Sequence, residues 1–189
     1  MILVVMALEA EAQGKLQAEG AEVLFTGIGK VNASYRLTRR LAEHAARGER
    51  PLVVNFGTAG SRRYATGTVV ACHRFVQRDM DVTGLGFEHG QTPFEDLPRV
   101  LEFEPRLLHL PAGLCASGDS FETGEHHEEF EVLDMEAYAL AKVCLLENVP
   151  FVCAKYVSDG ADEHSGQTWE SALPAAARAF VDVYRRLLG

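Results

Sequence analysis

The sequence contains little that would suit a membrane protein, a secreted protein or a nucleic-acid binder. No apolar run is long enough to span a bilayer, and the short run at Met1–Ala7 has no basic flank and meets Glu9 and Glu11 at once, unlike a signal peptide. Lysine and arginine number 18 against 27 aspartates and glutamates, and the formal charge of −9 disfavours a nucleic-acid surface. We expect a cytoplasmic protein with neither membrane nor nucleic acid as a partner.

Cysteine and metal-binding motifs are also scarce. The 4 cysteines form no CxxC, and Cys115, Cys144 and Cys153 lie in apolar segments, which predicts reduced, buried thiols. The polar stretch at residues 125–129 (EHHEE) lacks HExxH spacing, so we interpret it as a solvated loop and expect no metal. No GxSxG nucleophile elbow is present.

Short apolar runs alternate with helical patterns along all 189 residues, without a repeat or a linker, which predicts one α/β domain over residues 1–189. We expect a largely parallel sheet with helices on both faces. The apolar runs predict strands at Met1–Ala7, Glu22–Thr26, Leu52–Asn55, Thr68–Val76, Leu114–Ser117 and Phe151–Val157. The helical patterns predict helices at Ala10–Ala18, from an Asn32 cap to Ala46, at Met135–Leu146 and at Ala172–Leu188.

In open α/β sheets, ligands bind at the carboxyl ends of strands. Polar or glycine-bearing segments follow the predicted strands at Glu9–Glu11, Gly27–Lys30, Gly57–Gly60, Gly118–Glu122 and Ser158–Asp162. We predict turns at Gly27–Gly29 and Gly57–Gly60. Gly27–Lys30 resembles part of a phosphate loop but lacks the spacing of a Walker or GxGxxG motif.

Taken singly, the acidic residues in and near these segments are ambiguous. Glu11 suits a solvated first helical turn or a cleft, and Ser158-Asp159 suits a helix cap or catalysis. Glu136 fits the start of a helix, or it could accept hydrogen bonds from a sugar diol. Lys155 interrupts an apolar strand, where it either reaches solvent at an edge or acts as a countercharge for Asp159 or Glu136.

Eight stretches in this order and spacing resemble one family, the 5′-methylthioadenosine/S-adenosylhomocysteine nucleosidases of the purine and uridine phosphorylase superfamily. They are residues 7–11, 26–33, 55–60, 79–83, 90–93, 117–121, 134–137 and 157–162. The resemblance covers nearly the whole chain. It implies a three-layer single domain with a central twisted, mostly parallel mixed sheet flanked by helices, as in nucleoside phosphorylases.

The resemblance also implies roles for individual residues. Glu11 falls on the carboxylate that activates water, Asp159 on the acid that protonates the purine N7, and Glu136 on the carboxylate that holds the ribose hydroxyls. Other positions imply substrate contacts: Met135 beside the ribose, Phe121 stacked on the base, the Glu122 backbone at the base edge, Thr58 near the water and ribose, Leu8 and Trp169 around the 5′ substituent, and Ser158 beside the acid.

The implied activity is hydrolysis of the N-glycosidic bond of a purine nucleoside, with a 5′-modified adenosine such as methylthioadenosine or S-adenosylhomocysteine as the preferred substrate. It needs no cofactor, and the family forms homodimers. Glu9 and Glu11 would repel phosphate, which favours water as the nucleophile, although Arg62 and Arg63 leave a phosphate-dependent phosphorylase open.

This chain departs from the family pattern in four places. Lys155 stands where many relatives carry arginine, Glu122 replaces a more usual apolar residue, and residues 92–113 and 123–131 are shortened. A nucleosidase for futalosine or an adenosyl-lipid, and a non-catalytic nucleoside-binding homologue, therefore also remain open.

Overall fold

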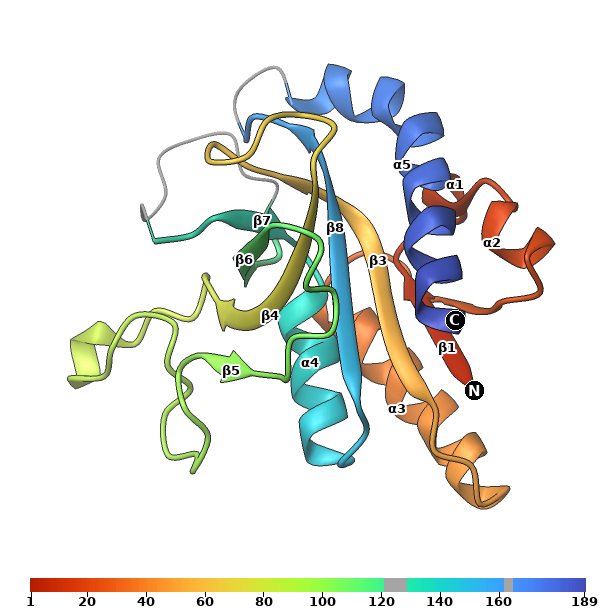
Figure 1. Cartoon of the computed structure of the whole chain (residues 1–189). Helices are drawn as coiled ribbons and strands as arrows, with labels where there is room; N and C mark the ends of the chain where they lie inside the picture. Colours follow the sequence, from red (N-terminus) through yellow and green to blue (C-terminus); the bar gives the residue numbers. More distant parts are fainter. Residues whose placement is uncertain (121–128, 162–164) are drawn as a thin grey trace.

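The alternation of apolar runs and helical patterns becomes a mixed sheet with helices against it in the computed structural model, which describes residues 1–120, 129–161 and 165–189 (Figure 1). The strands are β1 (Ile2–Met6), β2 (Glu22–Phe25), β3 (Leu52–Gly60), β4 (Val69–Gln77), β5 (Leu101–Glu102), β6 (Ala112–Ser117), β7 (Val132–Asp134) and β8 (Phe151–Asp159). The helices are α1 (Glu9–Ala12), α2 (Lys15–Ala18), α3 (Lys30–Ala46), the 3₁₀ turn η1 (Thr83–Leu85), α4 (Ala137–Leu146) and α5 (Ser165–Leu188).

The sheet is mostly parallel. Strand β1 pairs in parallel with β2 and β3, β3 with β8, and β6 with both β4 and β7. The antiparallel pairs are β3 with β7, β4 with β5, and β4 with β8. Because β8 joins β3 to β4 and β7 joins β6 to β3, these five strands close into a ring, from which β1 and β2 extend.

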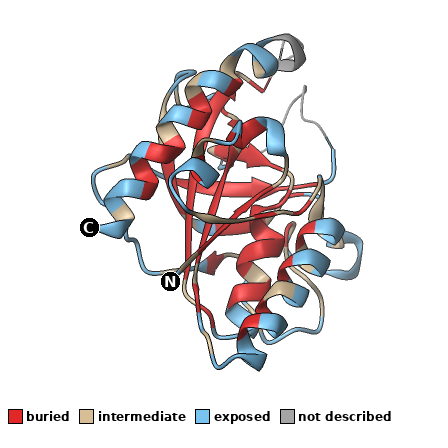
Figure 2. Ribbon diagram, turned by 90° about the vertical axis from the view of Figure 1, so that its right-hand side faces the viewer, coloured by how far each residue is buried: buried red, intermediate tan, exposed pale blue. Residues whose placement is uncertain are grey.

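Two helical layers cover the sheet, as predicted. Helices α3 and α4 pack on one face, where Leu37 and Leu140 are buried, whereas α2 and α5 pack with a second cluster around Phe56 and Phe180. Figure 2 shows the buried residues concentrated in the strands and on the inner helix faces. No helix among the described residues is long and apolar enough to cross a membrane.

Several element boundaries differ from the sequence predictions. The predicted turn Gly57–Gly60 is the end of β3, and Ser158-Asp159 is the end of β8 rather than a helix cap. Asn32 does not cap α3, which begins at Lys30, and its side chain donates to the backbone oxygen of Ile28. The predicted helix Ala10–Ala18 is two short helices, because Gln13 and Gly14 adopt positive φ between them.

Other differences are omissions or shifted ends. Strands β5 and β7 were not predicted, because two and three residues are too short to show a strand periodicity. Helix α4 begins at Ala137 rather than Met135, and α5 begins at Ser165, earlier than predicted. All four cysteines are buried and free, which confirms the prediction of reduced thiols.

Candidate active site

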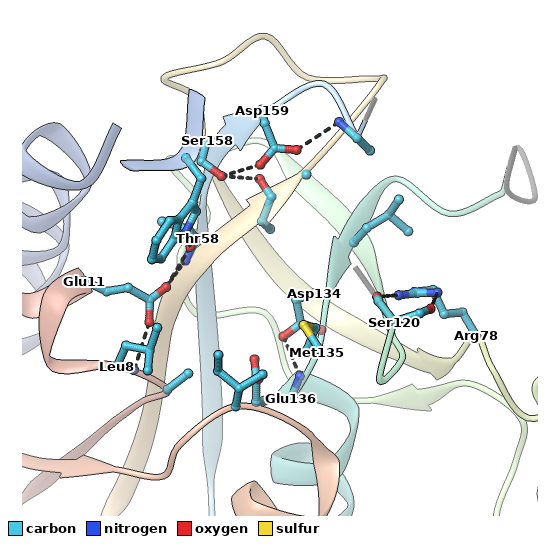
Figure 3. A pocket seen from close by; sticks show the side chains of 17 residues that line it. Leu8, Glu11, Thr58, Arg78, Ser120, Asp134, Met135, Glu136, Ser158 and Asp159 are labelled. Carbon is cyan, nitrogen blue, oxygen red and sulfur yellow. Dashed lines mark hydrogen bonds between the residues drawn. The ribbon is translucent and has the colours of Figure 1, made fainter. Parts of the chain in front are cut away.

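A cavity of about 240 Å³ lies at the edge of the sheet where β1, β3, β7 and β8 end (Figure 3). Because β1, β3 and β8 are parallel, the residues at their carboxyl ends converge there, and the antiparallel β7 adds Leu133 and Asp134 to the lining. The described lining is Ala7, Leu8, Glu11, Ile28, Thr58, Ala59, Gly60, Arg78, Ser120, Leu133, Asp134, Met135, Glu136, Ser158, Asp159, Ala161 and Trp169. It therefore includes eight of the ten predicted site residues. The other two, Phe121 and Glu122, lie outside the described residues.

Glu11 lies in α1, directly after β1, and only 4% of it is exposed. Its Oε1 atom accepts hydrogen bonds from the backbone N–H of Thr58 at 2.8 Å and from the Thr58 hydroxyl at 2.7 Å. Its Oε2 atom accepts one from the backbone N–H of Leu8 at 3.2 Å. The carboxylate is thus held between the first strand–helix junction and β3.

The glycine in β3 opposite Glu11 leaves room for charged groups. A Cβ atom at Gly57 would lie 3.1 Å from Lys155 Nζ and 3.6 Å from Glu11 Oε1. Gly60 has the same function at Asp159, because a Cβ there would lie 2.9 Å from Asp159 Oδ1. The two glycines thus lie in a strand, and each is needed because a carboxylate occupies the space that a side chain would take.

Glu136 immediately precedes α4 and accepts a 2.7 Å hydrogen bond from the backbone N–H of Gly29. Gly29 has φ of 94°, which a residue with a side chain rarely adopts. Burial, and next the negative charge of Asp134, raise the pKa of Glu136 to about 7, although Lys155 and the Gly29 N–H oppose this shift. Glu136 therefore changes charge close to neutral pH.

Asp134, which the sequence reading did not single out, is the partner of Lys155. The two side chains are almost fully buried, with Lys155 Nζ 2.9 Å from Asp134 Oδ2. Burial opposes ionisation of Asp134, but the charge of Lys155 and a hydrogen bond from Ser117 outweigh it and lower its pKa. Burial likewise opposes the charge of Lys155, but Asp134 holds the pKa of Lys155 well above its ordinary value. The ion pair of Lys155 is therefore with Asp134, which was not predicted, and not with Asp159. The charge of Lys155 also acts to lower the pKa of Glu136, which agrees with the predicted countercharge for Glu136.

Asp134 also organises the part of the cavity that Glu136 lines. Its Oδ2 atom accepts hydrogen bonds from the backbone N–H groups of Glu136 at 3.2 Å and Ala137 at 2.8 Å. The buried ion pair therefore fixes the start of α4 and, with it, the backbone of Glu136. The sequence feature that could have predicted this role is the position of Asp134, three residues before the first residue of α4.

Asp159 ends β8 and is 5% exposed. Its Oδ2 atom accepts a 2.7 Å hydrogen bond from the Ser158 hydroxyl, and its Oδ1 atom accepts a 3.0 Å bond from the Ala161 N–H. It lies on a different side of the cavity from Glu11 and Glu136 (Figure 3). An acid and a base can therefore act on opposite sides of one bound molecule.

The described lining contains four acids and one arginine, Arg78, and Lys155 neutralises only one of the acids, Asp134. Arg78 and Ser120 were not predicted, and Arg78 donates to the hydroxyl of Ser120 at 3.1 Å. Such a lining suits a neutral, hydroxyl-rich or cationic ligand better than a free anion.

The backbone amides that resembled a phosphate loop are occupied by carboxylates of the protein itself. Gly29 N–H donates to Glu136, and Lys30 N–H donates to Asp119 at 2.9 Å. Arg62 donates to the Ala161 carbonyl oxygen and Arg63 forms an ion pair with Glu131, and neither belongs to the described cavity lining. In the described part of the chain, these two amides and these two arginines therefore already have partners within the protein.

Comparison with known proteins agrees with this architecture. The model of the family described as "Phosphorylase superfamily" matches residues 11–188, which places the chain in that class. A 5′-methylthioadenosine/S-adenosylhomocysteine nucleosidase of Geobacillus kaustophilus is 33% identical over 201 residues, covering 94% of this chain and 83% of the relative. The chain belongs to this nucleosidase family.

Solved structures carry the same fold. The nucleosidase of that name from Neisseria meningitidis, in complex with methylthio-immucillin-A, is 28% identical with a TM-score of 0.79, and the match covers 94% of this chain and 93% of that chain. A futalosine hydrolase mutant of Helicobacter pylori is 20% identical with a TM-score of 0.83, covering 98% of both chains. Proteins named for different substrates therefore share this fold, and the fold alone does not identify the substrate of this chain.

Proposed function

We propose that this protein hydrolyses the N-glycosidic bond of a purine nucleoside, and that its substrate is a 5′-modified adenosine such as methylthioadenosine or S-adenosylhomocysteine. The products are the free base and the ribose derivative. The observation that carries this proposal is the convergence of Glu11, Glu136 and Asp159 on one cavity from three different strand or helix ends. Family membership supports the same reaction.

In this mechanism Asp159 donates a proton to the purine N7 as the bond from the base nitrogen to the ribose C1′ breaks, because a purine anion is a poor leaving group. The carboxylate that remains accepts hydrogen bonds from Ser158 and Ala161, which stabilise its charge. Glu11 takes a proton from water as the water oxygen bonds to C1′. Proton donation and uptake therefore balance.

Glu136 binds the 2′- and 3′-hydroxyls of the ribose. Its ionised form accepts hydrogen bonds from both hydroxyls, and its negative charge also stabilises the positive charge that develops on the sugar as the bond breaks. The Asp134–Lys155 pair holds this residue in position through the start of α4. In this proposal Met135 lies beside the ribose, with Leu8 and Trp169 near the 5′ substituent. The family resemblance assigns the contacts with the base to Phe121 and the Glu122 backbone, which lie outside the described residues.

Water is favoured over phosphate as the nucleophile by the contacts of the N-terminal amides of α3. Glu136 and Asp119 already accept hydrogen bonds from Gly29 and Lys30, and four acids line the described cavity. A phosphate dianion would be repelled by these carboxylates, and the amides of Gly29 and Lys30 already donate to side chains of the protein.

We also propose that the protein is cytoplasmic and a homodimer. Four free, buried cysteines suit a reducing compartment. Val31 and Tyr35 on α3 are 78% and 58% exposed and, with Leu146 of α4, line a shallow groove that a second copy would cover. Light scattering coupled to size-exclusion chromatography tests this state, and a monomer at micromolar concentration would refute the dimer.

The reaction is tested by incubating the protein with methylthioadenosine, S-adenosylhomocysteine, adenosine and inosine, each with and without phosphate, and measuring free base. We expect release of adenine without phosphate, fastest from the 5′-modified nucleosides. Release that requires phosphate would make the protein a phosphorylase. No release from any nucleoside would refute both enzymatic functions for these substrates.

A further inference from the structure

The only tryptophan of the chain, Trp169, forms a hydrogen bond that its predicted role beside the 5′ substituent does not require. Its indole Nε1–H donates to the hydroxyl oxygen of Thr58 at 2.8 Å. The same hydroxyl lies 2.7 Å from Glu11 Oε1, to which it donates. A continuous path of two hydrogen bonds therefore runs from α5 through β3 to the carboxylate of Glu11.

The direction of these bonds follows from the donors available. An indole N–H can only donate, so the Thr58 oxygen uses a lone pair to accept from Trp169. The single hydrogen of the hydroxyl is then free to point at the carboxylate of Glu11. Without the indole, the hydroxyl could rotate and give its hydrogen to another acceptor, such as water.

The path also determines which oxygen of Glu11 meets the substrate water. Oε1 accepts two hydrogen bonds, from the backbone and the hydroxyl of Thr58, which occupy both of its lone pairs. Within the described part of the chain, Oε2 accepts one, from Leu8 N–H at 3.2 Å. One lone pair of Oε2 is therefore available to take a proton from water.

Helix α5 is well placed to hold this contact. Its Phe180 is fully buried and stacks on Phe56 of β3 with a centroid distance of 5.1 Å. Phe56 and Thr58 share one face of β3, because side chains alternate along a strand. The helix that carries Trp169 is thus anchored on the same face of the strand that carries Thr58.

We propose that Trp169 is a positioning residue for Glu11, which acts through the Thr58 hydroxyl to aim the water-activating carboxylate. The inference rests on the proposed function, because it assigns Glu11 the role of base. The indole then acts on the rate of the hydrolytic step as well as lining the pocket. A phenylalanine at this position would line the pocket equally but could not hold the hydroxyl.

A double-mutant cycle tests this path. Trp169→Phe keeps an aromatic ring and removes the N–H, whereas Thr58→Val keeps the shape and removes the hydroxyl. We expect Trp169→Phe to lower kcat about 3- to 10-fold with KM changed less than about 3-fold, as for one lost hydrogen bond that acts in the transition state. In the Thr58→Val background, the same substitution should cause no further loss of kcat.

Two further variants serve as controls. Thr58→Ser retains the hydroxyl, so Trp169→Phe should lower kcat by the same factor in this background as in the wild type. Glu170→Gln alters the exposed neighbour of Trp169 on α5 and should leave kcat and KM unchanged. Two results would overturn the positioning role. One is a loss of kcat in the double variant that equals the product of the losses in Trp169→Phe and Thr58→Val, and the other is a change in KM alone after Trp169→Phe.

The fluorescence of Trp169 separates this inference from the proposed function. Because the chain has one tryptophan, its emission reports this site alone. Thr58→Val should shift the emission maximum, whereas Thr58→Ser and Glu170→Gln should not. An unchanged emission in Thr58→Val would refute the hydrogen bond itself, whatever the activity. A different result would refute the proposed function instead. In that case the three variants show the expected emission maxima, but the wild-type protein releases no base, which also refutes the role of Glu11 as base.

Discussion

Replacing Glu136 with glutamine should make the protein more stable above neutral pH and less active. Glu136 is buried, and burial together with the charge of Asp134 raises its pKa from the ordinary 4.5 to about 7. This difference corresponds to about 3 kcal/mol of free energy that disfavours the ionised side chain in the folded protein. Glutamine has nearly the same shape, carries no charge, and retains an oxygen that can accept from Gly29 N–H.

The sign of the pH dependence follows from proton binding. Between about pH 4.5 and 7, the folded protein keeps a proton on Glu136 that the unfolded chain has lost. The stability that this proton contributes is fully present below about pH 4.5 and is lost as the pH rises through about 7. The variant has no such proton, so its advantage should appear only at the higher pH.

Urea unfolding of the wild type and Glu136→Gln at about pH 4.5 and pH 8 measures this difference. We expect equal stability at the lower pH and a gain of about 3 kcal/mol for the variant at the higher pH. For a chain of this size the gain corresponds to a rise in Tm of about 6–12 °C. Glu170→Gln removes an exposed carboxylate from α5 and should show no such pH-dependent gain.

Glu136→Gln should also lose activity. Its side chain has one acceptor oxygen and no charge, whereas an ionised carboxylate has two acceptor oxygens for the two ribose hydroxyls. We expect kcat/KM for the 5′-modified nucleoside to fall at least about 100-fold. A variant that is no more stable than the wild type at about pH 8, or a gain that is the same at both pH values, would refute the electrostatic reasoning.

Three further predictions concern other residues of the site. Glu11→Gln and Asp159→Asn should each lower kcat about 100- to 10,000-fold with an unchanged circular dichroism spectrum, and full activity of either would refute its assigned role. Gly60→Ala should lower kcat while the protein still folds, because the new Cβ would lie 2.9 Å from Asp159 Oδ1; wild-type kinetics would show that β3 and Asp159 adjust freely. Lys155→Met should destabilise the protein by about 3–5 kcal/mol at neutral pH, because Asp134 would stay buried without its partner, and a Tm equal to that of the wild type would contradict this.

The order of strands and helices could be predicted from the sequence because hydrophobic periodicity is a local property. The runs at β1, β4 and β8 show it directly, and the predicted strands there differ from the observed ones by at most two residues at either end. The errors lie where the local signal was ambiguous or short. Small residues in Gly57–Gly60 are typical of turns, but here they continue β3 by pairing with β8, and Gly57 and Gly60 are small because carboxylates lie against them.

Candidate site residues could be predicted because their motifs follow strands in a fixed order, and parallel strands bring such segments to one edge. Eight of the ten indeed line the cavity. Each carboxylate alone had an equally good explanation as a helix cap or a solvated turn. The order of eight motifs, rather than any single residue, was the informative feature.

The sequence by itself thus determined the α/β class, the family and eight of the residues that line the cavity. Only the tertiary structure decided which groups are partners: Gly29 and Glu136 are 107 positions apart, and Thr58 and Trp169 are 111 apart. It also paired Lys155 with Asp134. The physical reason is that charge compensation and hydrogen bonding in a buried site depend on distances of a few ångströms, which chain folding sets and a local pattern does not encode.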